Sequence, residues 1–117
     1  MTNKYGAKKA VCCQGHTHDS KAESYRCELL HLKQKKGLIS DLRVQVKYLL
    51  IPAMTYENMP NEKAENYIAD FVYQENGFTI IEDVKGRKTR DYIIKRKQMK
   101  QKYCTDGKTI FREVQNK

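Results

Sequence analysis

The chain has 117 residues, of which 39% are hydrophobic and 32% charged, and its mean hydropathy is -0.82. This length suits a single domain, and the composition is globular rather than disordered. The sequence contains neither the roughly 18 uninterrupted apolar residues of a membrane span nor the apolar core of a signal peptide, so we expect a cytoplasmic protein without a membrane partner. The net charge of +9 favours a polyanionic partner instead.

Residues 1–18 are predicted to form a basic N-terminal arm. The arm carries Cys12, Cys13, His16 and His18, residue types that zinc prefers as ligands. Adjacent cysteines followed by His-x-His match no zinc finger or ribbon, and no second pair of ligands follows. We therefore expect free thiols in a reducing compartment and no structural zinc.

A helix is predicted from about Asp19 to Lys35, with a capping box formed by Ser20 and Glu23. Its main apolar face is predicted to be Ala22, Tyr25, Leu29 and Leu32, which recur at helical spacing. A second stripe beside that face holds Glu23, Cys27 and Leu30. Glu23 therefore has two interpretations: it only closes the capping box, or it also reaches a site on the sheet.

Residues 42–51 alternate and then become fully apolar, which predicts a central strand covered on both faces. Pro52 ends the strand, and a polar loop is expected over 53–65. Gln45 and Lys47 share one face of this strand. That face either lines a site or is a polar face turned to solvent.

Residues 68–85 are predicted to form a hairpin around Asn76-Gly77, the strongest short signal for a two-residue type I′ turn. The register then pairs Glu75 with Phe78, Tyr73 with Ile80, Val72 with Ile81 and Asp70 with Asp83. Two carboxylates directly opposite each other are destabilising unless something compensates, and a divalent cation is the obvious candidate. Alternation along the strand places Lys85 on the same face as Asp83.

A basic turn at 86–89 leads into a helix predicted over 90–103, whose apolar stripe is Tyr92, Met99 and Tyr103. Nine basic residues and one acid fall between Lys85 and Lys102. A solvated basic helix is the simplest explanation, but its place beside the Asp-x-Lys strand favours a nucleic-acid partner. A last strand is expected over 109–114. The predicted fold is therefore a single αβββαβ domain of the α/β class, with a mixed four-stranded sheet flanked by helices.

Asp70 followed by Asp83-Val84-Lys85 resembles the PD-(D/E)XK nuclease superfamily, with Ala69 where the short signature has proline. The αβββαβ order is similar to the restriction-endonuclease-like core of that superfamily, here over residues 19–117. More narrowly, the chain resembles a family of small phage and prophage proteins regarded as nuclease-like and near Holliday-junction resolvases. The segments that carry this resemblance are residues 4–9, 19–23, 44–47, 67–73 and 82–86, with Thr89 and Lys95.

The resemblance implies a Mg²⁺- or Mn²⁺-dependent endonuclease acting on branched or duplex DNA. The metal ligands would be the carboxylates of Asp70 and Asp83, the carbonyl of Val84 and, from the first helix, Glu23. Lys85 would act on the reacting phosphate, and Glu23 could alternatively serve as base. The residues expected to contact DNA are Gln45, Arg87, Lys88, Arg90 and Lys95.

Two other functions remain open at this point. One is a non-catalytic DNA-binding protein on the same fold, and the other is an RNA-binding or inhibitory phage protein, which aromatic stacking platforms would favour. Resolvases cut as dimers, so a homodimer is possible, although the sequence shows no coiled-coil seam or other dimer face.

Overall fold

The structure is a computed structural model that describes residues 10–11, 17–18, 21–85 and 87–115. Its elements are β1 (Ala10–Val11), β2 (Thr17–His18), α1 (Lys21–Lys35), β3 (Ser40–Ile51), β4 (Glu65–Glu75), β5 (Phe78–Lys85), α2 (Arg90–Tyr103) and β6 (Thr109–Gln115). After the short antiparallel pair β1–β2, the order is the predicted αβββαβ. The capping residue Ser20 lies outside the described residues.

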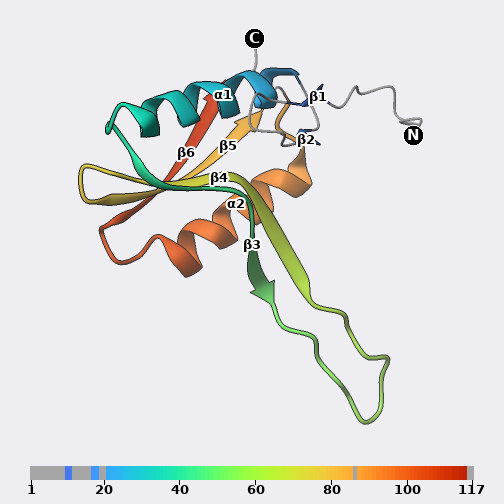
Figure 1. Ribbon diagram of the computed structural model, residues 1–117. Coiled ribbons are helices and arrows are strands. Elements are labelled where there is room, and N and C mark those ends of the chain that lie inside the picture. Colours follow the sequence, from blue (N-terminus) through green and yellow to red (C-terminus); the bar gives the residue numbers. More distant parts are fainter. Residues whose placement is uncertain (1–9, 12–16, 19–20, 86, 116–117) are drawn as a thin grey trace.

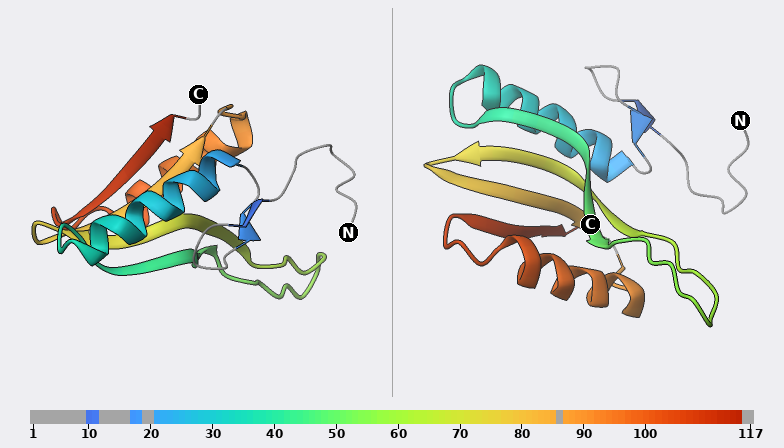
Figure 2. Two further views of the ribbon diagram at one scale, coloured as in Figure 1. Left: turned by 45° about the horizontal axis from the view of Figure 1, so that its top comes forward. Right: turned by 90° about the horizontal axis from the view of Figure 1, so that it is seen from below.

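The four long strands form one mixed sheet in the order β3-β4-β5-β6. The first three are antiparallel neighbours, and β6 joins parallel to β5 through the crossover helix α2. The two helices lie on opposite faces of the sheet, so the domain has three layers (Figures 1 and 2). This confirms the predicted α/β fold.

The turn between β4 and β5 explains their register. Asn76 and Gly77 both have positive φ, at 53° and 83°, as a type I′ turn requires. The ladder pairs Glu75 with Phe78, Tyr73 with Ile80, Val72 with Ile81 and Phe71 with Glu82. The predicted hairpin register is therefore confirmed up to Phe71 and Glu82, one step before Asp70 and Asp83.

Each face of the sheet has its own apolar core. The core on the α1 side contains Cys27, Leu30, Ile39, Phe71, Tyr73 and Ile80. The core on the α2 side contains Leu50, Tyr67, Ala69, Val72, Ile81, Tyr92 and Met99. The predicted bounds of α2 and its apolar stripe are confirmed, and its first turn is capped by Thr89, whose hydroxyl accepts from the Tyr92 N–H at 3.1 Å.

The predicted inner face of α1 is wrong. Its buried residues are Glu23, Ser24, Cys27 and Leu30, while Tyr25 and Leu32 are exposed. The helix turns its second stripe inward, where Cys27 and Leu30 pack in the apolar core and the neighbouring Arg26 finds a polar partner on the sheet. Arg26 forms a bidentate ion pair with buried Glu82 on β5.

The predicted central position of β3 is also wrong, because β3 is an edge strand and one of its faces is exposed. In its pairing with β4, Gln45 lies between the pairs Val44–Phe71 and Val46–Ala69, so it stands opposite Asp70. Its φ is 54°, in the left-handed region. Odd-numbered residues of β4 pack toward α2 before this point and toward α1 after it. The odd-numbered side chains of β4 therefore change from one face of the sheet to the other at Asp70.

Beyond this twist, the outer part of the β3–β4 hairpin projects well past both helices (Figure 1). We call residues 49–68 the hairpin arm. Its backbone is paired at Met54 and Glu62, which exchange two hydrogen bonds of 2.9 Å. The segment predicted as a polar loop, 53–65, is irregular apart from this isolated bridge and the first residue of β4, as predicted.

Candidate functional site

Asp70 and Asp83 meet at the end of the β4–β5 hairpin farthest from its turn. Asp83 is only 1% exposed and Asp70 is half-buried. One Asp70 oxygen accepts the Val84 N–H at 2.8 Å, which carries its carboxyl past the end of the ladder toward β5. This bond brings the Asp70 carboxyl close enough to Asp83 for the Asp83 charge to act on the Asp70 pKa. The two acids that the register predicted to face each other therefore lie near one another, just beyond the last pair of the ladder.

The Asp70 carboxyl is strongly perturbed. Burial, followed by the hydrogen bond with Asp83 and the charges of Asp83 and Glu23, raises its pKa to about 9, against a lowering effect of the Val84 N–H. Near neutral pH and without a cation, the Asp70 carboxyl beside Asp83 is therefore largely protonated. A bound cation would stabilise the negative charge of such a pair of acids.

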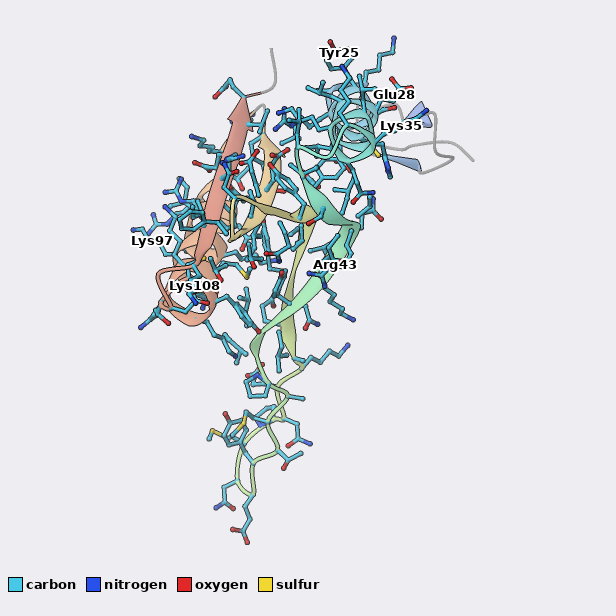
Figure 3. The ribbon with its side chains drawn as sticks, turned by 60° about the vertical axis from the view of Figure 1, so that its left-hand side comes forward. Tyr25, Glu28, Lys35, Arg43, Lys97 and Lys108 are labelled. Atoms are coloured by element: carbon cyan, nitrogen blue, oxygen red, sulfur yellow. The ribbon has the colours of Figure 1, made fainter. Side chains whose placement is uncertain are left out.

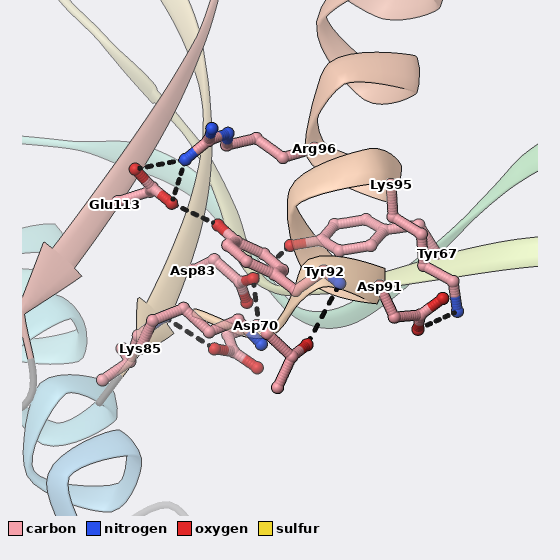
Figure 4. A network of polar contacts seen from close by, with 11 residues as sticks. Tyr67, Asp70, Asp83, Lys85, Asp91, Tyr92, Lys95, Arg96 and Glu113 are labelled. Atoms are coloured by element: carbon pink, nitrogen blue, oxygen red, sulfur yellow. Dashed lines mark hydrogen bonds and ion pairs between the residues drawn. The ribbon is translucent and has the colours of Figure 1, made fainter. Parts of the chain in front are cut away.

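Among the described residues, Asp83 has hydrogen-bond or ion-pair partners on only one of its two carboxylate oxygens. Tyr67 Oη donates a short hydrogen bond to Asp83 Oδ2, and Lys85 Nζ lies 3.3 Å from the same oxygen (Figure 4). Burial, together with the charge and hydrogen bond of Asp83, raises the Tyr67 pKa far above its usual value, so its hydroxyl remains a donor. Among the described residues, Asp83 Oδ1 is buried and has no hydrogen-bond partner. A buried oxygen of this kind is costly unless a ligand completes it.

Lys85 is positioned by an aromatic ring as well as by Asp83. Its Nζ lies 4.5 Å from the centre of the Tyr92 ring, and its side chain is 30% exposed. Tyr92 in turn donates to Glu113 Oε2 at 2.6 Å (Figure 4). Glu113 is the parallel neighbour of Asp83 on β6. Helix α2 and strand β6 therefore set the direction in which Lys85 points.

Glu113 itself is the acceptor for several cationic groups. Arg96 Nη1 lies 3.3 Å from Oε2, and Lys88 Nζ lies 3.4 Å from Oε1. Burial acts to raise the Glu113 pKa, but hydrogen bonds from Tyr92 and Arg96 outweigh it and the pKa is lowered. Glu113 is therefore ionised across the physiological range and keeps Tyr92 in place.

The structure also places the two remaining predicted residues of the site. Glu23 is buried on the inner face of α1, close enough for its charge to raise the Asp70 pKa. Gln45 is exposed and stands alongside Asp70 in the hairpin ladder. Lys47, which shares the outer face of β3, is exposed as well.

These groups suit a hard divalent cation, although the described residues do not hold a preformed cage. No set of three or more His, Cys, Asp or Glu side chains in the described ranges is gathered in a metal-holding arrangement. Two adjoining carboxylates, an unsatisfied buried oxygen and a third acid nearby are nevertheless the oxygen donors that Mg²⁺ and Mn²⁺ use. The residues that would hold the ion are Asp70 and Asp83, with Glu23 and the Val84 carbonyl as further donors.

The basic residues predicted to contact DNA fall into two groups. Lys88 is bound to Glu113, and Lys95 lies 3.0 Å from Glu65 and 3.8 Å from Asp91. Arg87 and Arg90 are exposed, and neither forms an ion pair with another described residue. Arg87 and Arg90 are therefore the more available pair for an external phosphate.

The sequence left three important side chains unassigned. Tyr67 and Tyr92 were predicted only as core residues, and Glu113 only as part of the last strand. The parallel pairing of β6 with β5, which brings Glu113 beside Asp83, is the signal that could have identified it. The predicted cluster of Cys12, Cys13 and His16 lies outside the described residues.

The half-buried Asp70 and the buried Asp83, with Lys85 beside them on a mixed αβββαβ sheet, define an α/β protein with a candidate acidic site. The chain belongs to the family described as "Protein of unknown function (DUF1064)", which matches residues 2–116. No curated protein and no solved structure matches the chain. Neither α1 nor α2, the helices of the described part, combines the length and apolar character needed to cross a bilayer.

Proposed function

We propose that this protein is a metal-dependent endodeoxyribonuclease of the PD-(D/E)XK type, with branched DNA such as a Holliday junction as its substrate class. The observation that carries the proposal is the contact between Asp70 and Asp83 with Lys85 at 3.3 Å, directly before a strongly basic segment. A protein acting on intracellular DNA would work in the cytoplasm, in the host's if it is phage-encoded.

A bound Mg²⁺ would supply Lewis-acid polarisation of the scissile phosphate and a lowered pKa for a bound water. Asp70 and Asp83 would hold the ion, because the charge of Asp83 raises the Asp70 pKa when no cation is present. Lys85, oriented by Tyr92, presents its ammonium to the charge that develops on the phosphoryl oxygens. Glu23 contributes a further oxygen or accepts a proton from the attacking water.

The grip on DNA falls to the start of α2. Arg87 lies just before this helix and Arg90 is its first residue, on either side of the N-cap Thr89 and a few residues after Asp83 and Lys85 in the chain. Contacts of this kind go to phosphates and carry no sequence information, which suits recognition of DNA structure rather than sequence. Lys88 and Lys95 contribute positive potential while remaining paired with acids of the protein.

Two variants separate chemistry from grip. Lys85→Ala is expected to lower the single-turnover cleavage rate by on the order of 10² or more with little loss of affinity. Arg87→Ala/Arg90→Ala is expected to weaken binding to all DNA sequences and to reduce the salt slope by about one unit per contact. Lys108→Ala, an exposed lysine near the start of β6, is the matched control.

Cleavage is measured at saturating protein with Mg²⁺ on junction, flap and duplex substrates, and binding at several salt concentrations. Equal losses of rate and affinity in both variants would make Lys85 one more phosphate clamp. If none of these substrates is cleaved, a non-catalytic function becomes the better explanation.

That alternative is a non-catalytic DNA-binding protein, which the lack of a preformed three-ligand metal cage among the described residues favours. Titration calorimetry with Mg²⁺, compared with Asp70→Asn, separates the two. An RNA-binding role based on base stacking has less support, because the rings of Tyr67, Phe71 and Tyr73 are buried.

A further inference from the structure

The hairpin arm is ordered without being packed. Every residue from 51 to 65 is exposed except Tyr56, which is half-buried. The arm is nevertheless paired at Met54 and Glu62, and the Tyr56 N–H donates to Asn61 Oδ1 at 2.9 Å. A two-stranded ribbon with no core of its own is only marginally stable in water, and ordering its backbone costs entropy. A partner that covers such a ribbon would therefore increase its stability.

The arm carries nearly half of the exposed large hydrophobic residues of the described chain. Of the eleven exposed large hydrophobic residues, five belong to it, namely Leu49, Ile51, Met54, Met59 and Ile68. On a chain with this density of charge, a concentration of this kind marks an interaction surface rather than ordinary surface. The end of the arm near the sheet is anchored, since Tyr103 Oη donates to the Leu49 carbonyl at 2.6 Å.

The charge of the arm selects the partner. Residues 49–68 contain three acids and one lysine in a chain whose net charge is +9. Glu65 is bound by Lys95 at the arm's base, and Glu57 and Glu62 remain at the tip with Lys63. The two acids and one lysine at the tip leave a net charge of −1, which favours a basic and apolar partner over a phosphate backbone or a second arm.

The outer face of α1 has both properties. Tyr25 is 71% exposed, Leu32 47% and Leu38, just after the helix, 59%. Lys21, Lys35 and Lys36 are exposed around them, with Glu28 as the acid of this face. Figure 3 shows Tyr25 pointing away from the sheet, at the opposite end of the molecule from the arm. This is the stripe that helical spacing predicted to be buried.

We propose that the protein forms a two-fold dimer in which the hairpin arm of each copy docks on the outer face of α1 of the other. Two reciprocal contacts close the assembly, as an isologous dimer requires. A stable interface needs about 20–30 residues per partner, which one arm together with one helix face provides. Helix α2 is left uncovered in this arrangement.

Three variants test the arrangement by light scattering and sedimentation without DNA or metal. Met54→Asp/Met59→Asp alters the arm, and Tyr25→Asp/Leu32→Asp places negative charge on the helix face. Each is expected to raise the dimer dissociation constant by about 100-fold or more, since each removes two apolar anchors. Ile94→Asp, on exposed α2, should leave the mass of the dimer unchanged. Circular dichroism checks that each variant folds.

Mixing the two altered proteins is the decisive measurement. A mixed dimer keeps one intact contact, between the unaltered arm of one copy and the unaltered helix of the other, so dimer should reappear only in the mixture. A wild-type protein that stays monomeric at all concentrations overturns the proposal. So does a mixture without rescue, or an arm variant that loses only DNA affinity, which would assign the arm to DNA. None of these readouts depends on cleavage.

Discussion

Two adjacent residues of β5 carry carboxylates that are almost wholly buried, and the protein treats them in opposite ways. Glu82, on the α1 face, receives two hydrogen bonds from Arg26, at 2.7 and 2.9 Å, and one from Tyr73 Oη at 2.6 Å. Asp83, on the α2 face, receives one from Tyr67 and has Lys85 at 3.3 Å. Its other oxygen has no partner among the described residues, and its neighbour is another acid.

The contrast separates a structural charge from a functional one. Every need of Glu82 is met within the protein, because a bidentate guanidinium and a hydroxyl neutralise it. The charge of Glu82 also raises the Arg26 pKa through that hydrogen bond. Asp83 keeps one buried oxygen without a partner among the described residues, and a second acid lies beside it. A cation would neutralise both charges. Burial alone therefore does not identify a site, whereas incomplete neutralisation does.

The largest expected effect comes from removing the partner of each acid. Arg26→Met leaves Glu82 buried and unpaired, and we expect the free energy of unfolding to fall by about 3–5 kcal/mol. Lys85→Met is the matched change beside Asp83. It should cost about 1 kcal/mol or less, because this lysine is partly exposed and its acid is already poorly compensated. Urea unfolding at pH 7 measures both, and equal losses would erase the distinction.

A sharper test removes one hydroxyl from each acid. Tyr67→Phe and Tyr73→Phe each take a donor from a buried carboxylate, so both should lose about 1–3 kcal/mol of stability in metal-free buffer. Added Mg²⁺ should restore much of the loss in Tyr67→Phe, where the ion can satisfy Asp83. Tyr73→Phe should show no greater response than the wild type. Thermal melts with and without Mg²⁺ decide this, and equal recovery would contradict the assignment.

A change of condition, rather than of a partner residue, tests the same contrast through the pH dependence of stability without metal. The folded-state pKa of Asp70 is about 9 and its unfolded value about 3.8, so this group favours folding fully only below the lower value. Its contribution is lost as the pH rises toward 9, with a slope of at most about 1.4 kcal/mol per pH unit. Asp70→Asn should flatten the curve and raise stability at pH 8. Denaturant unfolding from pH 5 to 9 shows whether the slope persists in the variant.

The parts of this protein that could be predicted from sequence rest on local signals. Asn76-Gly77 determines the turn, and counting from it brings Asp70 to Asp83 because strand pairing has a strict period. The bounds of α2 follow from the basic turn at 86–89 and from the regular spacing of Tyr92, Met99 and Tyr103. These features are decided within a few residues of chain.

The inner face of α1 could not be predicted in this way. Hydrophobic spacing favoured Tyr25 and Leu32, but the helix is oriented by Arg26, whose partner Glu82 lies 56 residues away. The edge position of β3 was missed for a related reason. The apolar run ending at Ile51 suggested burial on both faces, whereas the strand continues into an exposed arm. Both errors concern the packing of one element against another, which depends on residues far away in the chain.

The hairpin that carries both acids also has a kinetic consequence. Its contacts close over a two-residue turn, whereas β6 reaches β5 only after the chain has passed through all of α2. Short loops close at a lower entropic cost, so the β4–β5 hairpin should form earlier on the folding path than the parallel pair. The repulsion between Asp70 and Asp83 then opposes an early step, before Tyr92 and Glu113 surround the site. Lowering the pH, which favours the protonated form of Asp70, should therefore accelerate refolding.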